Sequence, residues 1–170
     1  MTVVYPKLST IKNVHYQKLI QQCQLFHIPI HENMPLRSEL LLKTDDVQEH
    51  KEGDSTLLLL HTYDCILDAI FGFSFQSSVP IREPYKSCIA DMMYAQHAWK
   101  TKIISVDIPS GWDVQEGDTT KSGLHPTVLV SLTAPKRCAQ FFHGTKHYVG
   151  GRFIPPCIAE KYHIKVCTEI

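Results

Sequence analysis

The chain has 170 residues, of which 44% are hydrophobic and 20% charged, and 17 Lys and Arg residues balance 17 Asp and Glu residues. This length and composition predict one globular domain with a sizeable core and argue against intrinsic disorder. The zero net charge argues against a nucleic-acid binder and against a polybasic membrane-surface protein. No segment reaches the roughly 20 apolar residues that cross a bilayer, so we expect no transmembrane segment.

The six cysteines are unevenly spaced and form no Cys-x-x-Cys pair, and the ten histidines form no His-Glu-x-x-His motif. Zinc-ribbon and thioredoxin-type sites therefore have no support. Cys65 and Cys88 lie in apolar segments, a placement typical of buried free thiols. A reducing compartment follows from this pattern, which favours a cytoplasmic or mitochondrial protein over a secreted one.

The first third of the chain predicts two short extended segments around one helix. Residues 2–5 are rich in β-forming side chains. Apolar residues three and four positions apart predict an amphipathic helix over 13–26, and Pro29 favours an extended segment over 28–30. The polar and charged residues 36–54 predict a helix followed by a loop.

The rest of the chain predicts strands that alternate with helical or turn-rich segments. The predicted strands are 65–71, 102–107, 127–132 and 146–149, and a helix is predicted over 84–98. Near-continuous apolar strands on either side of a helix are typical of a parallel sheet covered by helices. We therefore predict a three-layer α/β/α, Rossmann-like domain with a mostly parallel sheet, spanning residues 1–170.

Polar clusters follow three predicted strands at their carboxyl ends, where open parallel sheets bind ligands. They are Asp68 with the turn 72–78, the segment 107–113, and the segment 133–136. One crossover joins the strands of Asp68 and Asp107, so we expect neighbouring strands about 4.8 Å apart. Two carboxylates at one edge suit a hard cation or acid/base chemistry, and the Ser110 hydroxyl is close enough in sequence to reach the same place.

A structural interpretation of the same residues stands beside this one. An aspartate at a strand end is often a turn former or a helix cap, so a structural role is the alternative interpretation of Asp68 and Asp107. Trp112 is more typical of a packing residue than of a stacking platform. No Gly-x-Ser-x-Gly elbow, P-loop or Gly-x-Gly-x-x-Gly fingerprint is present. The sequence therefore gives no support for nucleophilic hydrolysis or for a familiar nucleotide-binding motif.

Five segments occur in a fixed order along the chain and carry a more specific pattern. They are DAIFGFSF (68–75), REP (82–84), SVDIPSGWDV (105–114), LVSLTAPK (129–136) and GGRFIPP (150–156). Together they resemble the YjeF N-terminal domain family, over about Thr2 to Tyr162, and DIPSGWDV is the most specific of them. The resemblance implies a Rossmann-like fold and an NAD(P)H-hydrate epimerase activity, which interconverts the R and S epimers of hydrated NADH and NADPH for an S-specific dehydratase.

The resemblance also implies roles for individual residues. Asp68 and Ser110 would help to bind a potassium ion, and Asp107 is the candidate catalytic acid or base. The implied substrate contacts are Gly72, Phe73, Ser74, Phe75, Gln76, Ser77, Ser78 and Asp107.

The chain departs from the family pattern in two places. The family's first βα unit, with its GPGNNGGDG-type phosphate loop, is not in this sequence, and Gln76-Ser77-Ser78 stands where the family has Lys-Gly-Asp. We therefore expect a domain truncated at its N-terminus, with an exposed sheet edge, a homodimeric state and weak or absent epimerase turnover. The alternative is a non-catalytic binding protein that uses the same fold to contact a protein partner such as apolipoprotein A-I.

Overall fold

The computed structural model describes residues 1–33, 63–75, 79–150 and 154–164, and the helix predicted within 36–54 lies outside these ranges. The elements in chain order are β1 (Val3–Val4), η1 (Leu8–Thr10), α1 (Val14–Leu25), β2 (Ile30–His31), β3 (Cys65–Asp68), α3 (Tyr85–Trp99), β4 (Lys102–Val106), β5 (Val128–Leu132), η4 (Arg137–Phe141), β6 (Lys146–Gly150) and α4 (Pro156–Lys161). Within the described part, no helix combines the length and apolar character needed to span a membrane.

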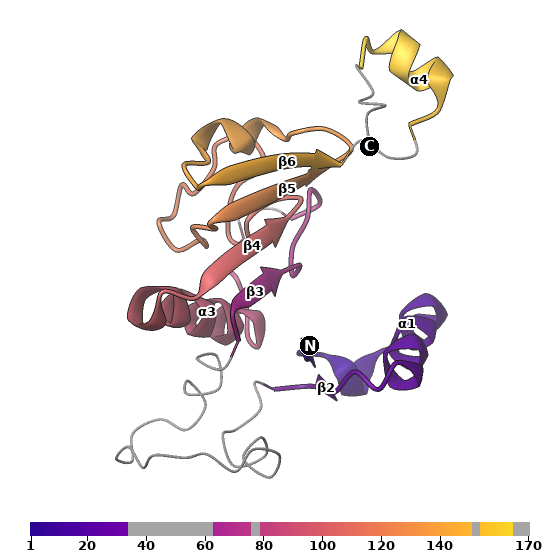
Figure 1. Ribbon diagram of the computed structural model, residues 1–170, viewed down its shortest axis with the longest axis vertical. Coiled ribbons are helices and arrows are strands. Elements are labelled where there is room, and N and C mark those ends of the chain that lie inside the picture. The colour runs from indigo at the N-terminus through magenta and orange to yellow at the C-terminus, as the bar shows by residue number, and fades with distance from the viewer. Residues whose placement is uncertain (34–62, 76–78, 151–153, 165–170) are drawn as a thin grey trace.

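The larger sheet contains four strands in the order β3-β4-β5-β6, and every neighbouring pair is parallel (Figure 1). This arrangement confirms the predicted parallel sheet and the β3-α3-β4 crossover. The strand predicted over 65–71 is too long, because β3 ends at Asp68. Beyond it the chain turns, and the Phe71 N–H bonds to the Ser110 hydroxyl at 3.3 Å instead of continuing the ladder with β4.

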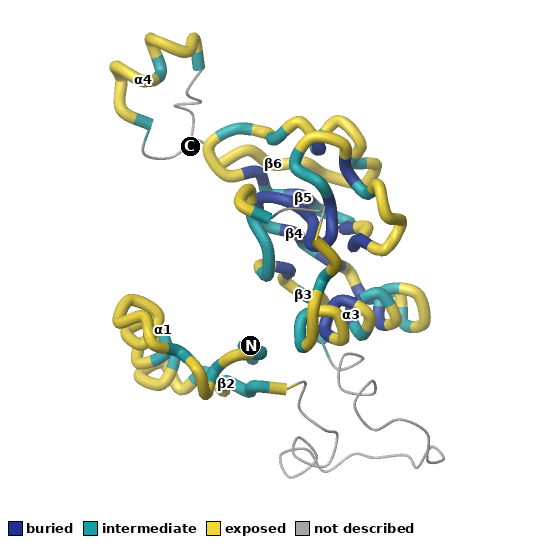
Figure 2. Tube along the Cα trace, turned by 180° about the vertical axis from the view of Figure 1, so that it is seen from behind, coloured by how far each residue is buried: buried dark blue, intermediate teal, exposed yellow. Residues whose placement is uncertain are grey.

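The core lies between α3 and one face of this sheet. Helical spacing places Cys88, Ile89, Met92 and Ala95 on the buried side of α3. Ile89 and Met92 pack with Ile103 of β4 and with Leu124 from the long loop after it. Seen from this side, α3 and loop segments lie in front of the strands (Figure 2).

The opposite face of the sheet is apolar and exposed. Strand alternation places Leu67, Leu132 and Tyr148 on this face, and they are 62%, 46% and 52% exposed. Among the described residues no helix packs on it, and Figure 1 shows the strands unobstructed from this side. The predicted parallel α/β class is thus confirmed, with its helical cover on one face in the described part of the chain.

The N-terminal segment forms a separate βαβ unit. β1 and β2 pair in parallel on either side of α1, as the predicted order of elements requires. The helix begins after Asn13, whose side chain accepts the His15 N–H at 2.8 Å, and none of its residues is buried. The Tyr63 hydroxyl donates to Thr2 Oγ1 at 2.7 Å, which links this unit to the chain entering β3.

Candidate active site at the carboxyl edge of the sheet

The predicted aspartates meet at one edge of the parallel sheet. Asp68 is the last residue of β3 and Asp107 directly follows β4, which ends at Val106. Because β3 and β4 are parallel neighbours, both carboxylates lie at the same carboxyl edge, as predicted. Both residues are buried, with 1% of Asp68 and 8% of Asp107 exposed.

Asp68 is surrounded by hydrogen-bond donors. Its Oδ2 accepts the Ser105 hydroxyl at 2.7 Å and the Ser110 N–H at 2.9 Å. Its Oδ1 accepts the Ser110 hydroxyl at 2.6 Å and the Ile70 N–H at 3.4 Å. A carboxylate offers about four acceptor positions, and all four here are matched by donors of the protein. Asp68 therefore fastens β3 to β4 and to the turn that carries Ser110.

Hydrogen bonds hold the turn after β3 to Ser110 and to Asp107. Ser110 receives the Phe71 N–H, and the Phe73 N–H donates to Asp107 Oδ2 at 3.0 Å. A side chain at Gly72 would place its Cβ 3.1 Å from that same oxygen, so glycine permits the close approach. Of the predicted substrate contacts, Gly72, Phe73, Ser74 and Phe75 lie in this turn, and Gln76, Ser77 and Ser78 lie outside the described residues.

Asp107 differs from Asp68 because some of its hydrogen-bond acceptor positions are unused. Its Oδ2 accepts one N–H from Phe73, and its Oδ1 forms an ion pair with the ammonium of Lys136. About two acceptor positions therefore stay available on this carboxylate. Lys136 was expected only as a member of a polar cluster, and no role was expected for Ser105. The signal for Ser105 was a hydroxyl at a buried position of an otherwise apolar strand.

The residues expected to hold potassium have donor atoms of the type that this ion prefers. Asp68 and Ser110 supply only oxygen atoms, which suit hard cations. One carboxylate balances one positive charge, so this donor set suits a monovalent ion better than a divalent one. Within the described ranges, no group of three or more His, Cys, Asp or Glu side chains could hold a metal ion. Binding of a cation here would compete with the hydrogen bonds of Asp68, of which the Ile70 contact is the longest.

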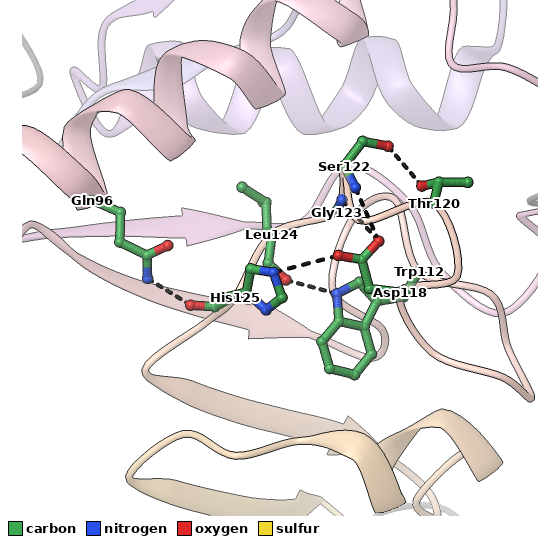
Figure 3. A network of polar contacts seen from close by, with 8 residues as sticks. All are labelled: Gln96, Trp112, Asp118, Thr120, Ser122, Gly123, Leu124 and His125. Carbon is green, nitrogen blue, oxygen red and sulfur yellow. Dashed lines mark hydrogen bonds and ion pairs between the residues drawn. The ribbon is translucent and has the colours of Figure 1, made fainter.

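A network of polar contacts joins Trp112 and Asp118 to the segment 122–125, close in sequence to Ser110 (Figure 3). Trp112 is 3% exposed and its indole N–H donates to the Leu124 carbonyl at 2.7 Å, so it packs as the structural interpretation expected. Asp118 Oδ1 accepts the N–H groups of Ser122 and Gly123 at 3.2 and 3.0 Å. The Leu124 N–H donates to the Ser110 carbonyl at 3.0 Å. Through this last hydrogen bond, the network holds the main chain of Ser110 in place.

Comparisons with known proteins identify the family and the fold of the chain. Residues 11–138 match the family described as YjeF-related protein N-terminus. The chain is also similar to yeast ynu0, YNL200c, in its crystal structure, with 34% sequence identity and a TM-score of 0.70. The alignment covers 92% of this chain and 57% of the yeast chain, so this chain spans less than two thirds of that relative. The predicted Rossmann-like fold is confirmed, and the chain belongs to the YjeF N-terminal family.

Proposed function

We propose that this chain is an NAD(P)H-hydrate epimerase, which binds hydrated NADH or NADPH at the carboxyl edge of β3 and β4 and interconverts the R and S epimers. Membership of the YjeF N-terminal family supports the proposal. The observation that carries it is the convergence of two buried carboxylates and the turn 71–75 on one sheet edge, where parallel α/β proteins bind ligands.

The two aspartates have different roles in this proposal. Inversion of the hydrated carbon requires its bond to oxygen to break and to re-form on the opposite face. A group of the protein must give a proton to the oxygen that leaves as water and take a proton from the water that adds again. Asp107 keeps unused acceptor positions and is the more exposed of the two carboxylates, so it is the better general acid or base. Such a group typically contributes about 10²- to 10⁴-fold to a rate. Asp68 instead holds the main chain of Ser110 in place.

Potassium is part of the proposal through the same residues. Asp68 and Ser110 would hold the ion with their oxygen atoms, beside the turn 71–75. When bound, potassium would supply a fixed positive charge that favours the phosphates of the substrate. We expect potassium, more than sodium, to raise the melting temperature of the chain in the presence of a nicotinamide nucleotide.

The decisive experiment is direct epimerisation of the R epimer of hydrated NADH. The purified chain is incubated with this epimer, and chromatography follows the appearance of the S epimer above the rate in buffer alone. We expect turnover that is slow for the family, because Gln76 replaces the lysine of the family pattern in the substrate turn. Formation of the S epimer no faster than in buffer would contradict the proposal.

A matched pair of variants identifies the acid or base. Asp107→Asn should lower the epimerisation rate at least about 100-fold, since it removes the group that moves the proton. Asp64→Asn makes the same change at an exposed position at the opposite end of β3, and it should leave the rate unchanged. Circular dichroism checks that both variants are folded. Equal rates in the two folded variants would remove Asp107 from the mechanism.

The alternative, a non-catalytic binding protein, has one observation in its favour. The uncovered face of the sheet presents Leu67, Leu132 and Tyr148 to the surroundings, as a protein-binding surface does. Apolipoprotein A-I is the candidate partner. A thermal-shift titration separates the two functions: NADP at millimolar concentration should raise the melting temperature of an epimerase. No shift with NADP, together with binding to immobilised apolipoprotein A-I, would favour the alternative.

A further inference from the structure

Lys136 lies between two strand ends at the candidate active site. Its ammonium forms an ion pair with Asp107 Oδ1 and donates to the Leu132 carbonyl at 2.7 Å. The Lys136 side chain is 20% exposed and that of Asp107 is 9% exposed, so the pair is largely removed from water. Buried ion pairs of this kind hold their partners firmly, and loss of one partner leaves an uncompensated charge.

The backbone after β5 is shaped to bring Lys136 back to this place. Thr133 directly follows β5 and has a φ of +68°, a left-handed conformation that is unusual for a β-branched residue. The Thr133 N–H donates to the Gly150 carbonyl at 2.7 Å, and the Ala134 N–H donates to the Leu132 carbonyl at 2.8 Å. The chain therefore reverses at once, and Lys136 reaches over the end of its own strand.

Asp107 adopts the corresponding conformation after β4, with a φ of +71°. Its second carboxylate oxygen accepts the Phe73 N–H at 3.0 Å. A continuous series of contacts thus runs from Lys136, after β5, through one carboxylate to the turn after β3. Without the ammonium, the buried carboxylate would be free to rotate toward water and release the Phe73 N–H.

We infer that Lys136 is a positioning residue for the candidate active site: it fixes the Asp107 carboxylate, and through it the turn 72–75, in the orientation that receives the substrate. The effect of Lys136 on nucleotide binding rests on the proposed function. Its effect on the turn does not, because the contacts that carry it lie within the protein.

Hydrogen exchange at the Phe73 amide measures this effect directly, by NMR or mass spectrometry. In Lys136→Met the Phe73 amide should exchange about tenfold faster than in the unmodified chain, as expected for the loss of one charged hydrogen bond. Lys136→Arg keeps the charge and should restore most of the protection. Lys18→Met makes the same substitution at an exposed position of α1 and should change nothing at Phe73.

A double variant tests the route of the coupling and covers the case in which Lys136→Met does not fold. Asp107→Asn should also loosen the Phe73 amide, and addition of Lys136→Met to it should loosen the amide no further. Removal of both charges leaves neither one uncompensated, so this double variant is the one best suited to fold. Unchanged exchange in folded Lys136→Met, or further loosening in the double variant, would overturn the inference.

A nucleotide titration on the same variants separates the inference from the proposed function. We expect NADP to bind Lys136→Met at least about tenfold more weakly than the unmodified chain, and Lys18→Met with unchanged affinity. If the unmodified chain does not bind NADP while its Phe73 amide still depends on Lys136, the proposed function is wrong and the positioning role stands. Normal NADP affinity in Lys136→Met would contradict the role of Lys136 at the site.

Discussion

Asp68 and Asp107 carry the same carboxylate group, but their hydrogen-bond partners differ. Asp68 receives two hydroxyl and two amide hydrogen bonds, so its acceptor positions are filled within the fold, and a bound cation would replace part of these contacts. Asp107 receives one amide hydrogen bond and one ion pair, which leaves acceptor capacity for a substrate. Asp68 thus has the structural contacts expected of a strand-end aspartate, while potassium binding at Asp68 and catalysis by Asp107 stay proposals.

The anchoring role of Asp68 can be tested by removing its carboxylate. Asp68→Ala leaves the buried Ser110 N–H and the hydroxyls of Ser105 and Ser110 without their acceptor, so the free energy of unfolding should fall by about 3 kcal/mol. Urea denaturation followed by circular dichroism measures the change. Asp64→Ala, at the exposed position directly before β3, is the control and should lower the free energy of unfolding by less than about 0.5 kcal/mol. Equal losses in the two variants would show that Asp68 is not an anchor.

At the scale of elements, both ends of each strand in the larger sheet were predictable to within one residue, except the end of β3. Ile103 and its neighbours form a β-branched run that predicts β4 from local sequence alone. The end of β3 depends on Ser110, which lies 42 residues away and draws the chain out of the sheet. The short helices η4 and α4 were not predicted, because neither has enough turns for a helical period to show in the sequence.

Some residues of the candidate site were predictable from the sequence and others were not. Asp68, Asp107 and Ser110 were found because consecutive parallel strands place their carboxyl ends together. Lys136 required knowledge of the reversal at Thr133, a positive-φ residue that no propensity indicates. Ser105 required the register between β3 and β4, which pairs it with Asp68. Long-range register and unusual backbone angles are therefore the parts of this site that its sequence does not reveal.

The reactivity of the cysteines tests which sides of β3 and α3 are exposed to solvent. The expectation of a buried thiol is wrong for Cys65, which lies exposed on the uncovered side of β3, and right for Cys88, which lies on the buried side of α3. Burial raises the pKa of both Cys88 and Cys138, for Cys138 to about 11, so only about one Cys138 thiol in a thousand is ionised at pH 8. Brief alkylation at pH 8 with peptide mass spectrometry should label Cys65 and leave Cys88 and Cys138 unlabelled. Fast labelling of Cys88 would contradict the packing of α3.

At the scale of the whole molecule, the sheet has two unequal faces. One is covered by α3 and by the loop of Figure 3, and the other exposes the apolar side chains of Leu67, Leu132 and Tyr148. Exposed apolar surfaces of this kind favour association. The formal net charge is zero, so two copies of the chain do not repel each other through their overall charge. These properties support the proposal of a homodimer in which the uncovered faces of two sheets pack together.

The homodimer is testable with two charges placed on this face. The unmodified chain should elute in size-exclusion chromatography with light scattering at twice the mass of one chain. The double variant Leu67→Glu with Leu132→Glu should elute as a monomer, because a two-fold interface would bring four carboxylates together in an apolar contact. Tyr94→Glu adds a charge to the exposed side of α3, on the covered side of the sheet, and should stay dimeric. A monomeric unmodified chain at every concentration, or dissociation caused equally by Tyr94→Glu, would rule out this face as the dimer interface.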